Sequence, residues 1–243
     1  MNNKNDTELD GNAQVALITA GGRGMGAAVA RELHAKGYRI AVMSPSDSAQ
    51  ILAAELGGLA INGSTANEAD LGRLVQTTMD AYGRIDVVLN HTGDPPKGGL
   101  LEISECDWMT GHELIMLSVN RMAKLVTPQM LKQGKGAFLN ITTFAAFEPT
   151  LSFPVSCAYR AALGVFPKLN ADRYGSANIR MNALLPGYID SLQHKTGTKG
   201  AIPMGRLGTV QKVAKAAAFL LSDDASYITG QNIRIDGGVT RHV

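Results

Sequence analysis

The sequence predicts an α/β fold, a doubly wound, seven-stranded parallel sheet with helices on both faces. Short apolar runs rich in β-branched residues alternate with longer segments of helical period along the whole chain. The runs are uniformly apolar, so each strand is expected to be buried on both faces, as happens when helices cover both sides of a parallel sheet. Right-handed crossovers then wind such a sheet in both directions.

The first βαβ unit consists of the run VALIT at 15–19, a helix at 24–36 and the run RIAVM at 39–43. Further strands are predicted at 59–61, 85–90, 137–142, 178–186 and 232–236, and further helices at 48–56, 67–82, 104–131, 155–174 and 209–222. Seven strands thus alternate with six helices. We expect residues 1–13 to form a polar tail and residues 14–243 to form one domain, because no linker separates two cores.

Composition and charge narrow the function. The chain has 243 residues, of which 45% are hydrophobic and 18% charged, and this composition excludes disorder. Its net charge of +2 excludes a strong attraction to nucleic acid. Cys106 and Cys157 lack the spacing of a zinc site or a disulfide framework. No segment has the length and hydropathy of a signal peptide or a membrane span. We therefore expect a cytoplasmic protein that acts on a small molecule, without a metal, a nucleic acid or a membrane as partner.

A glycine-rich turn, TAGGRGMG at 19–26, follows the first strand and leads directly into a helix. Such a turn lets backbone N–H groups approach a pyrophosphate, and the helix adds the positive end of its dipole. Tight βα turns also need glycine for purely conformational reasons, which is the alternative explanation. Ligands of doubly wound sheets bind beyond the carboxyl ends of the strands, where this turn lies.

From end to end, the chain resembles the short-chain dehydrogenase/reductase family in its compact, Rossmann-like, single-domain type, which includes 3-oxoacyl-(acyl-carrier-protein) reductases. The turn matches the family's TGxxxGxG motif, with Ala20 in place of the first glycine. NHTG at 90–93 resembles the family's NNAG, and Asn182 with PG at 186–187 matches its N…PG segment. FLLSDDASYITGQNIRIDGG at 219–238 resembles the family's C-terminal segment.

The resemblance implies a nicotinamide cofactor, and the residues favour NADP(H) over NAD(H). Relatives that prefer NAD place an acid at the end of the second strand, where this chain has Ser44, and the nearest acid is Asp47. Arg23 lies where basic residues of NADP-preferring relatives pair with the 2′-phosphate, although a solvated arginine is the alternative. Ser64 replaces an adenine-binding aspartate, and Ser191 replaces a threonine that contacts the nicotinamide amide. The expected cofactor-binding residues are Thr19, Gly21, Arg23, Gly24, Met25, Gly26, Ser44, Ser64, Asn90, Gly93, Arg160, Pro186, Gly187 and Ser191.

All four catalytic positions of the family are altered in this chain. NITT at 140–143 resembles the family's NISS and places Thr143 at the serine position. The tyrosine position, thirteen residues later, holds Ser156, and the lysine position, four further, holds Arg160. The asparagine position, 28 residues before Thr143, holds Ile115.

These replacements differ in their chemical consequences. Thr143 keeps a hydroxyl that can polarise a carbonyl, and Arg160 keeps a permanent positive charge that can bind ribose. Ser156 is the serious loss, because an aliphatic hydroxyl is a far weaker acid than a phenol. We therefore predict a non-standard catalytic centre of Thr143, Ser156 and Arg160, and do not expect ordinary dehydrogenase rates.

Other polar groups near these motifs are further candidates. Tyr159 lies one helical turn from Ser156 and is a candidate to approach the cleft, whereas Asn120 is too far around its helix to replace the missing asparagine. His91 is a candidate proton donor, and Tyr188 is expected at the cleft mouth or in its wall. A short lid at about 191–206, with His194, Lys195 and Lys199, indicates an open pocket or a small, anionic ligand, or simply a solvated basic loop.

The leading hypothesis is an NADP(H)-binding oxidoreductase that reduces a small carbonyl or oxidises an alcohol. The alternatives are a nucleotide-binding sensor or scaffold subunit without redox chemistry, and a non-redox enzyme on the same fold. The resemblance to halohydrin dehalogenases at Arg160 is outweighed, because those relatives keep the tyrosine and lose the glycine turn. By resemblance we also expect a homo-oligomer, a dimer or tetramer.

Overall fold

A single seven-stranded sheet organises the computed structural model, which describes residues 13–194 and 196–241. All neighbouring strands are parallel, and their order is β3-β2-β1-β4-β5-β6-β7. This confirms the predicted doubly wound, Rossmann-like sheet. The strands are β1 (Val15–Ile18), β2 (Arg39–Ser44), β3 (Leu59–Asn62), β4 (Val87–Asn90), β5 (Gly136–Ile141), β6 (Ile179–Pro186) and β7 (Asn232–Ile235).

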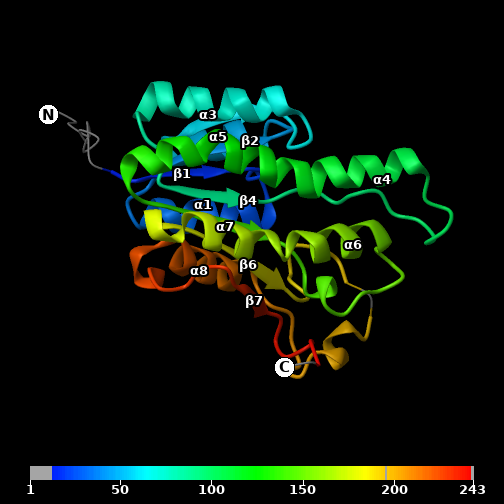
Figure 1. Ribbon diagram of the computed structural model, residues 1–243. Helices are drawn as coiled ribbons and strands as arrows, with labels where there is room; N and C mark the ends of the chain where they lie inside the picture. The colour runs from blue at the N-terminus through cyan, green and yellow to red at the C-terminus, as the bar shows by residue number, and fades with distance from the viewer. Residues whose placement is uncertain (1–12, 195, 242–243) are drawn as a thin grey trace, which may run out of the picture.

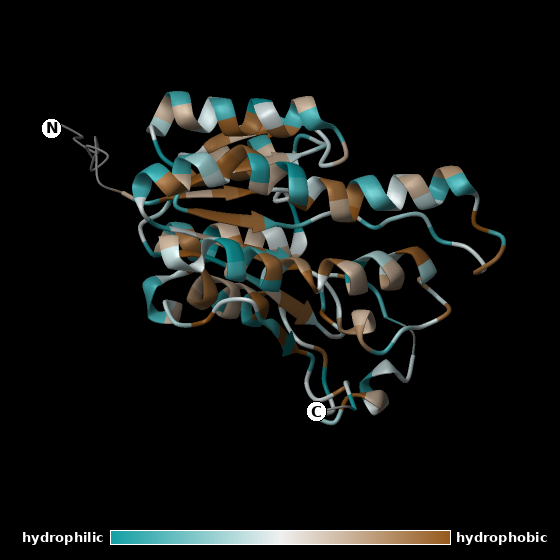
Figure 2. Cartoon of the chain, in the orientation of Figure 1, coloured by the Kyte–Doolittle hydropathy of each residue, from teal (hydrophilic) through white to brown (hydrophobic). Residues whose placement is uncertain are grey.

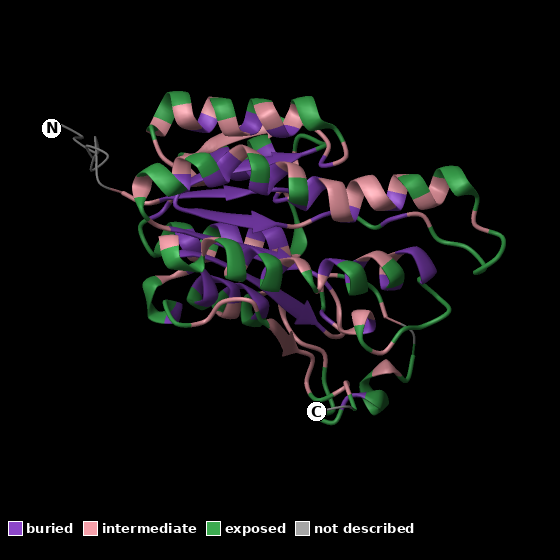
Figure 3. Ribbon diagram, viewed as in Figure 1, coloured by how far each residue is buried: buried purple, intermediate pink, exposed green. Residues whose placement is uncertain are grey.

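Helices cover both faces of this sheet (Figure 1). On one face α1 (Gly24–Ala35), α2 (Ser48–Leu56) and α8 (Val210–Leu221) pack on an apolar cluster that includes Ile18, Val42 and Leu139. On the other face α3 (Glu68–Tyr82), α5 (Ser118–Gln133) and α7 (Phe166–Tyr174) pack around Leu17, Met43 and Phe138. The five inner strands are accordingly among the most apolar and most buried segments in Figures 2 and 3. The edge strands β3 and β7 are only partly buried, so the expectation that each strand is buried on both faces is wrong for these two.

The chain reverses its winding direction between β1 and β4, which are neighbours in the sheet. The connection after β1 runs along one face through α1, whereas the long segment after β4 returns along the other face through α5. A crevice opens where two such connections diverge, at the carboxyl ends of the strands. α4 (Glu105–His112) and α6 (Pro154–Leu163) project beyond the sheet on this side, and the segment 191–206 also lies there (Figure 1).

Two of the six predicted helices are divided in the structure. The helix predicted at 104–131 consists of α4, a π-helical turn at Glu113–Leu117 and α5, and the hydroxyl of Ser118 donates to the Leu114 carbonyl at 2.6 Å. A π turn contains one residue more than an α turn and shifts the register of the helix, so a search for a constant helical period misses it.

The helix predicted at 155–174 is interrupted after Leu163, so the expected number of six helices is wrong. Pro167 has no N–H to donate to the Leu163 carbonyl, and its ring would clash there. The Asn232 amide donates to the Gly164 carbonyl at 2.8 Å, which satisfies part of the exposed helix end. The break separates α6 from α7.

Two other segments of the prediction are only partly visible. Of the predicted tail, residues 1–12 lie outside the described residues, as does Lys195 in the predicted lid. The described part of the lid contains one 3₁₀ turn, Thr198–Ala201, and is otherwise irregular. The division into a tail, one domain and a lid remains a prediction. None of the helices within the described ranges is long and apolar enough to cross a membrane.

The alanine that replaces the family's first glycine adopts a left-handed backbone conformation. Ala20 has a φ of +45° at the start of the turn between β1 and α1. For an L-residue this region costs about 1–2 kcal/mol, because Cβ crowds the following carbonyl. The turn is therefore formed at a cost that glycine would avoid.

We predict that Ala20→Gly stabilises the protein by about 0.5–1 kcal/mol, since relief of the strain exceeds the extra entropy of glycine in the unfolded chain. Urea unfolding measures this difference. Ala54→Gly, the same chemical change at an exposed position of α2, is the matched control and should destabilise by about 0.5–1 kcal/mol. A destabilising effect at both positions would contradict the strain assigned to Ala20.

Candidate functional site

The glycine turn forms the floor of the crevice at the end of β1. The Gly21 N–H donates to the Met43 carbonyl at 2.9 Å, which fixes the turn against the end of β2. A Cβ on Gly26 would lie 2.8 Å from the Ala20 carbonyl oxygen, so only glycine allows this close approach of helix and turn. Thr19 secures the other side, because its hydroxyl accepts from the His91 N–H at 2.9 Å and donates to the His91 carbonyl at 2.7 Å.

The first turn of α1 is open to an anion. Its N-cap residue, Arg23, has an extended backbone and makes no side-chain capping hydrogen bond. The first N–H groups of a helix have no acceptor within the helix, so those of Gly24, Met25 and Gly26 remain available. Uncapped N–H groups and the helix dipole together favour a phosphate at this position. The turn therefore fits the pyrophosphate of a dinucleotide.

A hollow of about 420 Å³ continues from the turn along the ends of β2 and α2. Arg23 is exposed there and makes no ion pair with another described residue, whereas Arg31 is already bound by Glu55 at 2.6 Å. The Ser44 hydroxyl donates to the Ser46 carbonyl at 2.7 Å. The residues that line the hollow are Gly22, Arg23, Arg31, Ser46, Asp47, Ser48, Ile51 and Leu52.

The remaining residues predicted to bind the cofactor are placed differently from one another. Ser64 follows β3, and its hydroxyl accepts from the Ala66 N–H at 3.3 Å. The buried side chain of Asn90 donates to Asn140 at 2.9 Å, so its amide is directed into the sheet. Gly93 has open space where a side chain would stand.

The end of β6 and the segment after it contain Pro186, Gly187 and Ser191. A Cβ on Gly187 would lie 2.7 Å from Cα of Asp236, so glycine is required where β6 leaves the sheet beside β7. The lid begins at Ser191, and its Cβ lies 3.5 Å from the position that a Cβ on Gly24 would take. The start of the lid thus faces the glycine turn across the crevice.

The three residues of the predicted catalytic centre lie at the ends of β5 and in α6. Thr143 begins the 3₁₀ turn Phe144–Ala146, where its hydroxyl accepts from the Ala145 N–H at 3.3 Å. Ser156 and Arg160 are one turn apart on α6, and Nε of Arg160 donates to Oγ of Ser156 at 3.1 Å. Nη1 of Arg160 donates to the Ile141 carbonyl at 2.8 Å, which brings this guanidinium to the end of β5.

Arg160 is a buried cation without a buried anion. Its side chain is 7% exposed, and within the described ranges it makes no ion pair. Its third hydrogen bond is a long one, 3.5 Å from Nη2 to the Thr92 hydroxyl. Burial lowers the pKa of Arg160 to about 10, against the favourable field of Asp94, so the guanidinium remains charged at neutral pH.

His91 is a poor proton donor in this environment. Burial and, to a smaller extent, the positive charge of Arg160 lower its pKa to about 4, and the Ala20 carbonyl and Asp94 only partly oppose these effects. The ring Nδ1 lies 3.4 Å from the Ala20 carbonyl oxygen. His91 is therefore neutral at physiological pH and supports the glycine turn.

Tyr159 does not approach the cleft, contrary to the expectation considered from the sequence. Its ring packs on α4, 5.8 Å from the Trp108 ring and 5.5 Å from the His112 ring. Ile115 lies fully buried in the π-helical turn, and Asn120 is exposed on α5, so neither supplies a polar group to the centre. Tyr159 therefore does not supply a phenol beside Ser156.

Aromatic side chains stand at the other side of the crevice. The Tyr188 ring lies 5.2 Å from the Phe144 ring and 5.5 Å from the His194 ring, and Nε2 of His194 lies 2.6 Å from the Ile189 carbonyl oxygen. These contacts connect the lid to the 3₁₀ turn that follows Thr143.

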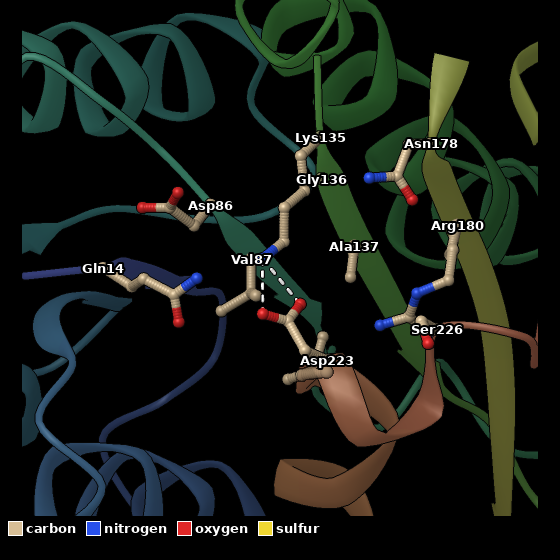
Figure 4. A pocket seen from close by; sticks show the side chains of 11 residues that line it. Gln14, Asp86, Val87, Lys135, Gly136, Ala137, Asn178, Arg180, Asp223 and Ser226 are labelled. Atoms are coloured by element: carbon tan, nitrogen blue, oxygen red, sulfur yellow. Dashed lines mark hydrogen bonds and ion pairs between the residues drawn. The ribbon is translucent and has the colours of Figure 1, made fainter. Parts of the chain in front are cut away.

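A second hollow, of about 270 Å³, lies at the opposite edge of the sheet (Figure 4). Its charged groups are already engaged. Lys135 binds Asp223 at 2.6 Å, Asp86 accepts from Arg84 at 2.6 Å, and the Arg180 guanidinium donates to three backbone carbonyls. Internal pairing leaves little charge for a ligand, which distinguishes this hollow from the crevice at the carboxyl ends.

Neither a disulfide nor a cluster of metal ligands is found among the described residues. Cys106 and Cys157 are both free. Among the residues that the structure describes, no group of three or more His, Cys, Asp or Glu side chains could hold a metal ion.

Comparison with known proteins identifies the family. Residues 19–240 match the family model described as enoyl-(acyl carrier protein) reductase. The chain belongs to the short-chain dehydrogenase/reductase family. It is 35% identical over 239 residues to a 3-oxoacyl-(acyl-carrier-protein) reductase of Synechocystis sp., covering 93% of this chain and 97% of that protein.

Two further comparisons support the same family. Nodulation protein G of Rhizobium meliloti is 32% identical over 234 residues, covering 92% of this chain and 96% of that protein. A 7α-hydroxysteroid dehydrogenase complexed with NADH and 7-oxo glycochenodeoxycholic acid superposes with a TM-score of 0.88 at 28% identity, covering 96% and 97% of the two chains. The dehydrogenase/reductase fold therefore extends over nearly the whole chain.

Sequence reasoning missed some groups that the fold brings to the site. Thr92 lies within NHTG, yet only the structure shows its hydroxyl beside Arg160. Ser46 and Ser48 line the hollow next to Arg23, and their hydroxyls lie 3.0 Å apart. A cluster of serines after the second strand was a visible signal for this surface, whereas nothing in the sequence indicated the Thr92 contact.

The neutral state of His91 predicts a pH dependence of stability. Its folded-state pKa of about 4 lies below the ordinary value of 6.5, so between these pH values the unfolded chain takes up a proton that the folded chain does not. Stability therefore falls as the pH is lowered from 6.5 to 4.

We predict that His91→Asn, which restores the family's residue, makes this fall shallower by up to ~1.4 kcal/mol per pH unit, the slope for one proton. Urea unfolding across this pH range measures it. His34→Asn on the exposed end of α1 is the control and should leave the slope nearly unchanged. An unaltered slope in His91→Asn would contradict the lowered pKa.

Proposed function

We propose that this chain is an NADP(H)-dependent oxidoreductase that reduces a small carbonyl or oxidises an alcohol, with Thr143, Ser156 and Arg160 as a non-standard centre. One observation carries the proposal. The uncapped glycine turn of α1 and a buried guanidinium bonded to a hydroxyl occupy the same edge of the sheet. Relatives support the proposal, because they include a 3-oxoacyl-(acyl-carrier-protein) reductase and a dehydrogenase complexed with NADH.

The residues that would hold the cofactor follow the crevice from one end to the other. The N–H groups of Gly24, Met25 and Gly26 suit the pyrophosphate, and the hollow beside Arg23 suits the adenosine half. The nicotinamide half would be held by Pro186, Gly187 and Ser191, together with Arg160. A bound nicotinamide supplies a hydride donor or acceptor, and the protein's task is alignment of the reacting groups.

The centre's own residues can stabilise negative charge on a substrate oxygen. The Ser156 hydroxyl accepts an N–H of Arg160, so its own proton remains free to donate. Thr143 adds a second hydroxyl, and the fixed charge of Arg160 favours an oxyanion nearby. None of these groups is a good acid at neutral pH, so water is the proton source and turnover is slow.

The preference for NADP(H) rests on Arg23. Its guanidinium is exposed and unpaired within the described residues, at the rim of a hollow lined by serine hydroxyls. A 2′-phosphate would receive charge-assisted hydrogen bonds there. Asp47 lines the same hollow and is the group that would instead favour the ribose hydroxyls of NAD(H).

A second candidate function is cofactor sensing without redox chemistry. It is favoured by the absence of a phenol from the centre, because Ser156 occupies the acid position and Tyr159 packs on α4.

We further propose, from resemblance to the family, that the protein forms a homo-oligomer in the cytoplasm.

We predict that NADPH binds more tightly than NADH and that Arg23→Ala weakens NADPH by about tenfold or more, the loss of one charge-assisted contact. Nicotinamide fluorescence during titration measures both affinities. Arg173→Ala on α7, outside the hollow, is the matched control and should leave both unchanged. A preference for NADH that Asp47→Asn abolishes would overturn the assignment to NADP(H).

The proposed centre can be tested by restoring the family's tyrosine and lysine. We predict that Ser156→Tyr combined with Arg160→Lys raises kcat for a neutral carbonyl compound, such as diacetyl, by about 10²- to 10⁴-fold, the usual contribution of a positioned acid. Oxidation of NADPH measures the rate. A fall from a measurable starting rate would contradict the slow, water-dependent mechanism and indicate that the present residues are the better catalysts.

A further inference from the structure

The chemistry of Arg160 suggests what the substrate carries besides its reacting group. A guanidinium has five N–H donors, and the hydrogen bonds to Ser156, Ile141 and Thr92 use three of them. Two donors are therefore left, one on each terminal nitrogen. All three acceptors are neutral oxygens, so the positive charge itself has no partner among the described residues.

Buried charges in proteins are normally paired, because removal from water is costly unless an opposite charge compensates. Arg160 is 7% exposed and remains protonated at neutral pH, since burial lowers its pKa only to about 10. Arg180, at the opposite edge of the sheet, is equally buried and also donates only to neutral carbonyls, but its three hydrogen bonds are 2.9–3.1 Å long, whereas the third of Arg160 is 3.5 Å. The nearest acid that affects it, Asp94, is itself bound to Lys97 at 3.0 Å.

Three other acids in the described loops at this edge of the sheet already accept backbone hydrogen bonds. Glu148, in the loop after β5, accepts from the backbone N–H of Arg241. Asp190 binds the Val210 N–H at 3.0 Å, and Asp236 binds the N–H groups of Gly238 and Thr240. The lid at 191–206 contains two lysines and an arginine but neither Asp nor Glu.

We propose that the site takes a substrate with a carboxylate next to its carbonyl or hydroxyl group, and that this carboxylate binds the guanidinium of Arg160 and the hydroxyl of Ser156. The hydroxyl of Thr143, which accepts from the Ala145 N–H and keeps its own proton, is then the donor to the reacting oxygen. The substrate class is thus an oxo or hydroxy acid. The two groups are suited to act together, because Ser156 accepts from Nε of Arg160 and keeps its own proton to donate. Arginine presents parallel N–H donors that match the two oxygens of a carboxylate.

This inference deepens the proposed function, because it names the substrate of the same site. It assigns Arg160 a task that the lysine of the family would perform less well, since an ammonium is a point charge without a planar fork. The competing explanation is that Arg160 only braces the structure, through its bonds to Ile141 and Thr92. A structural brace would not distinguish a carboxylate from a neutral group of the same shape.

The test compares pyruvate with pyruvamide, its uncharged counterpart, by isothermal titration calorimetry of the full chain with and without saturating NADPH. 3-Oxobutanoate and 3-oxobutanamide extend the comparison by one carbon. We expect the carboxylate to bind about tenfold or more tightly than the amide, as one charge-assisted hydrogen bond implies. In Arg160→Met this preference should disappear, whereas Arg160→Lys should retain part of it.

Ser156→Ala provides a second variant that leaves the buried cation in place, and it should lower carboxylate affinity without abolishing the preference. Thermal unfolding of each variant separates misfolding from loss of the ligand. Equal binding of acid and amide, no binding of either acid to the wild-type chain, or a preference that survives in Arg160→Met would overturn the proposal. Failure of NADPH to bind would refute the cofactor assignment alone, because the titration without NADPH still decides the role of Arg160.

Discussion

All seven strands of the sheet run in the same direction, and the arrangement of the candidate site depends on this constraint. Parallel strands present all their carboxyl ends at one edge, and the change of winding between β1 and β4 opens a crevice there. The glycine turn follows β1, NHTG follows β4, Thr143 follows β5 and the lid follows β6. The sheet topology thus brings residues that are more than a hundred positions apart in the chain to the same edge.

The electrostatics of the two sheet edges differ in a way that bears on function. At the amino ends, Asp86, Lys135 and Asp223 neutralise one another or their neighbours (Figure 4). At the carboxyl ends, Arg23 is unpaired among the described residues and Arg160 contacts only neutral acceptors. Arg180, at the amino ends, also contacts only neutral oxygens, but its three hydrogen bonds are shorter than the Nη2 contact of Arg160. The unpaired charge of Arg23 and the donors left on Arg160 are suited to phosphates and carboxylates, and they are the physical basis of both proposals.

The proposed centre has a hydroxyl and a guanidinium where the family has a phenol and an ammonium, and these groups differ in what they can do. A phenol beside a cation transfers protons near neutral pH, whereas Ser156 beside Arg160 can donate a hydrogen bond but releases its proton poorly. The exchange also fixes the charge, because the guanidinium stays protonated at physiological pH. Such a centre is better at holding an anion than at moving a proton, and His91 does not compensate because it is neutral.

Much of the fold was predictable, because it depends on local patterns. The uniformly apolar strands required a sheet covered on both faces, and the glycine turn required a tight βα connection. The break before Pro167 and the π turn around Ile115 were not apparent from the helical period, since both depend on single backbone hydrogen bonds. The direction of Tyr159 depended on its packing against Trp108 and His112, which no spacing rule contains. Residue spacing assigned Ser156 and Arg160, but the isolation of the guanidinium among neutral oxygens required the structure.

The central claim is that a nicotinamide cofactor lies in the crevice with its reactive half beside Arg160. The most direct measurement is the NMR signal of the Arg160 Nε–H group in ¹⁵N-labelled protein, identified by its loss in Arg160→Lys. We predict that saturation with NADPH shifts this signal, whereas adenosine 2′,5′-bisphosphate, which lacks the nicotinamide half, binds beside Arg23 and leaves it in place. An Arg160 signal that is unchanged in protein saturated with NADPH would contradict the account.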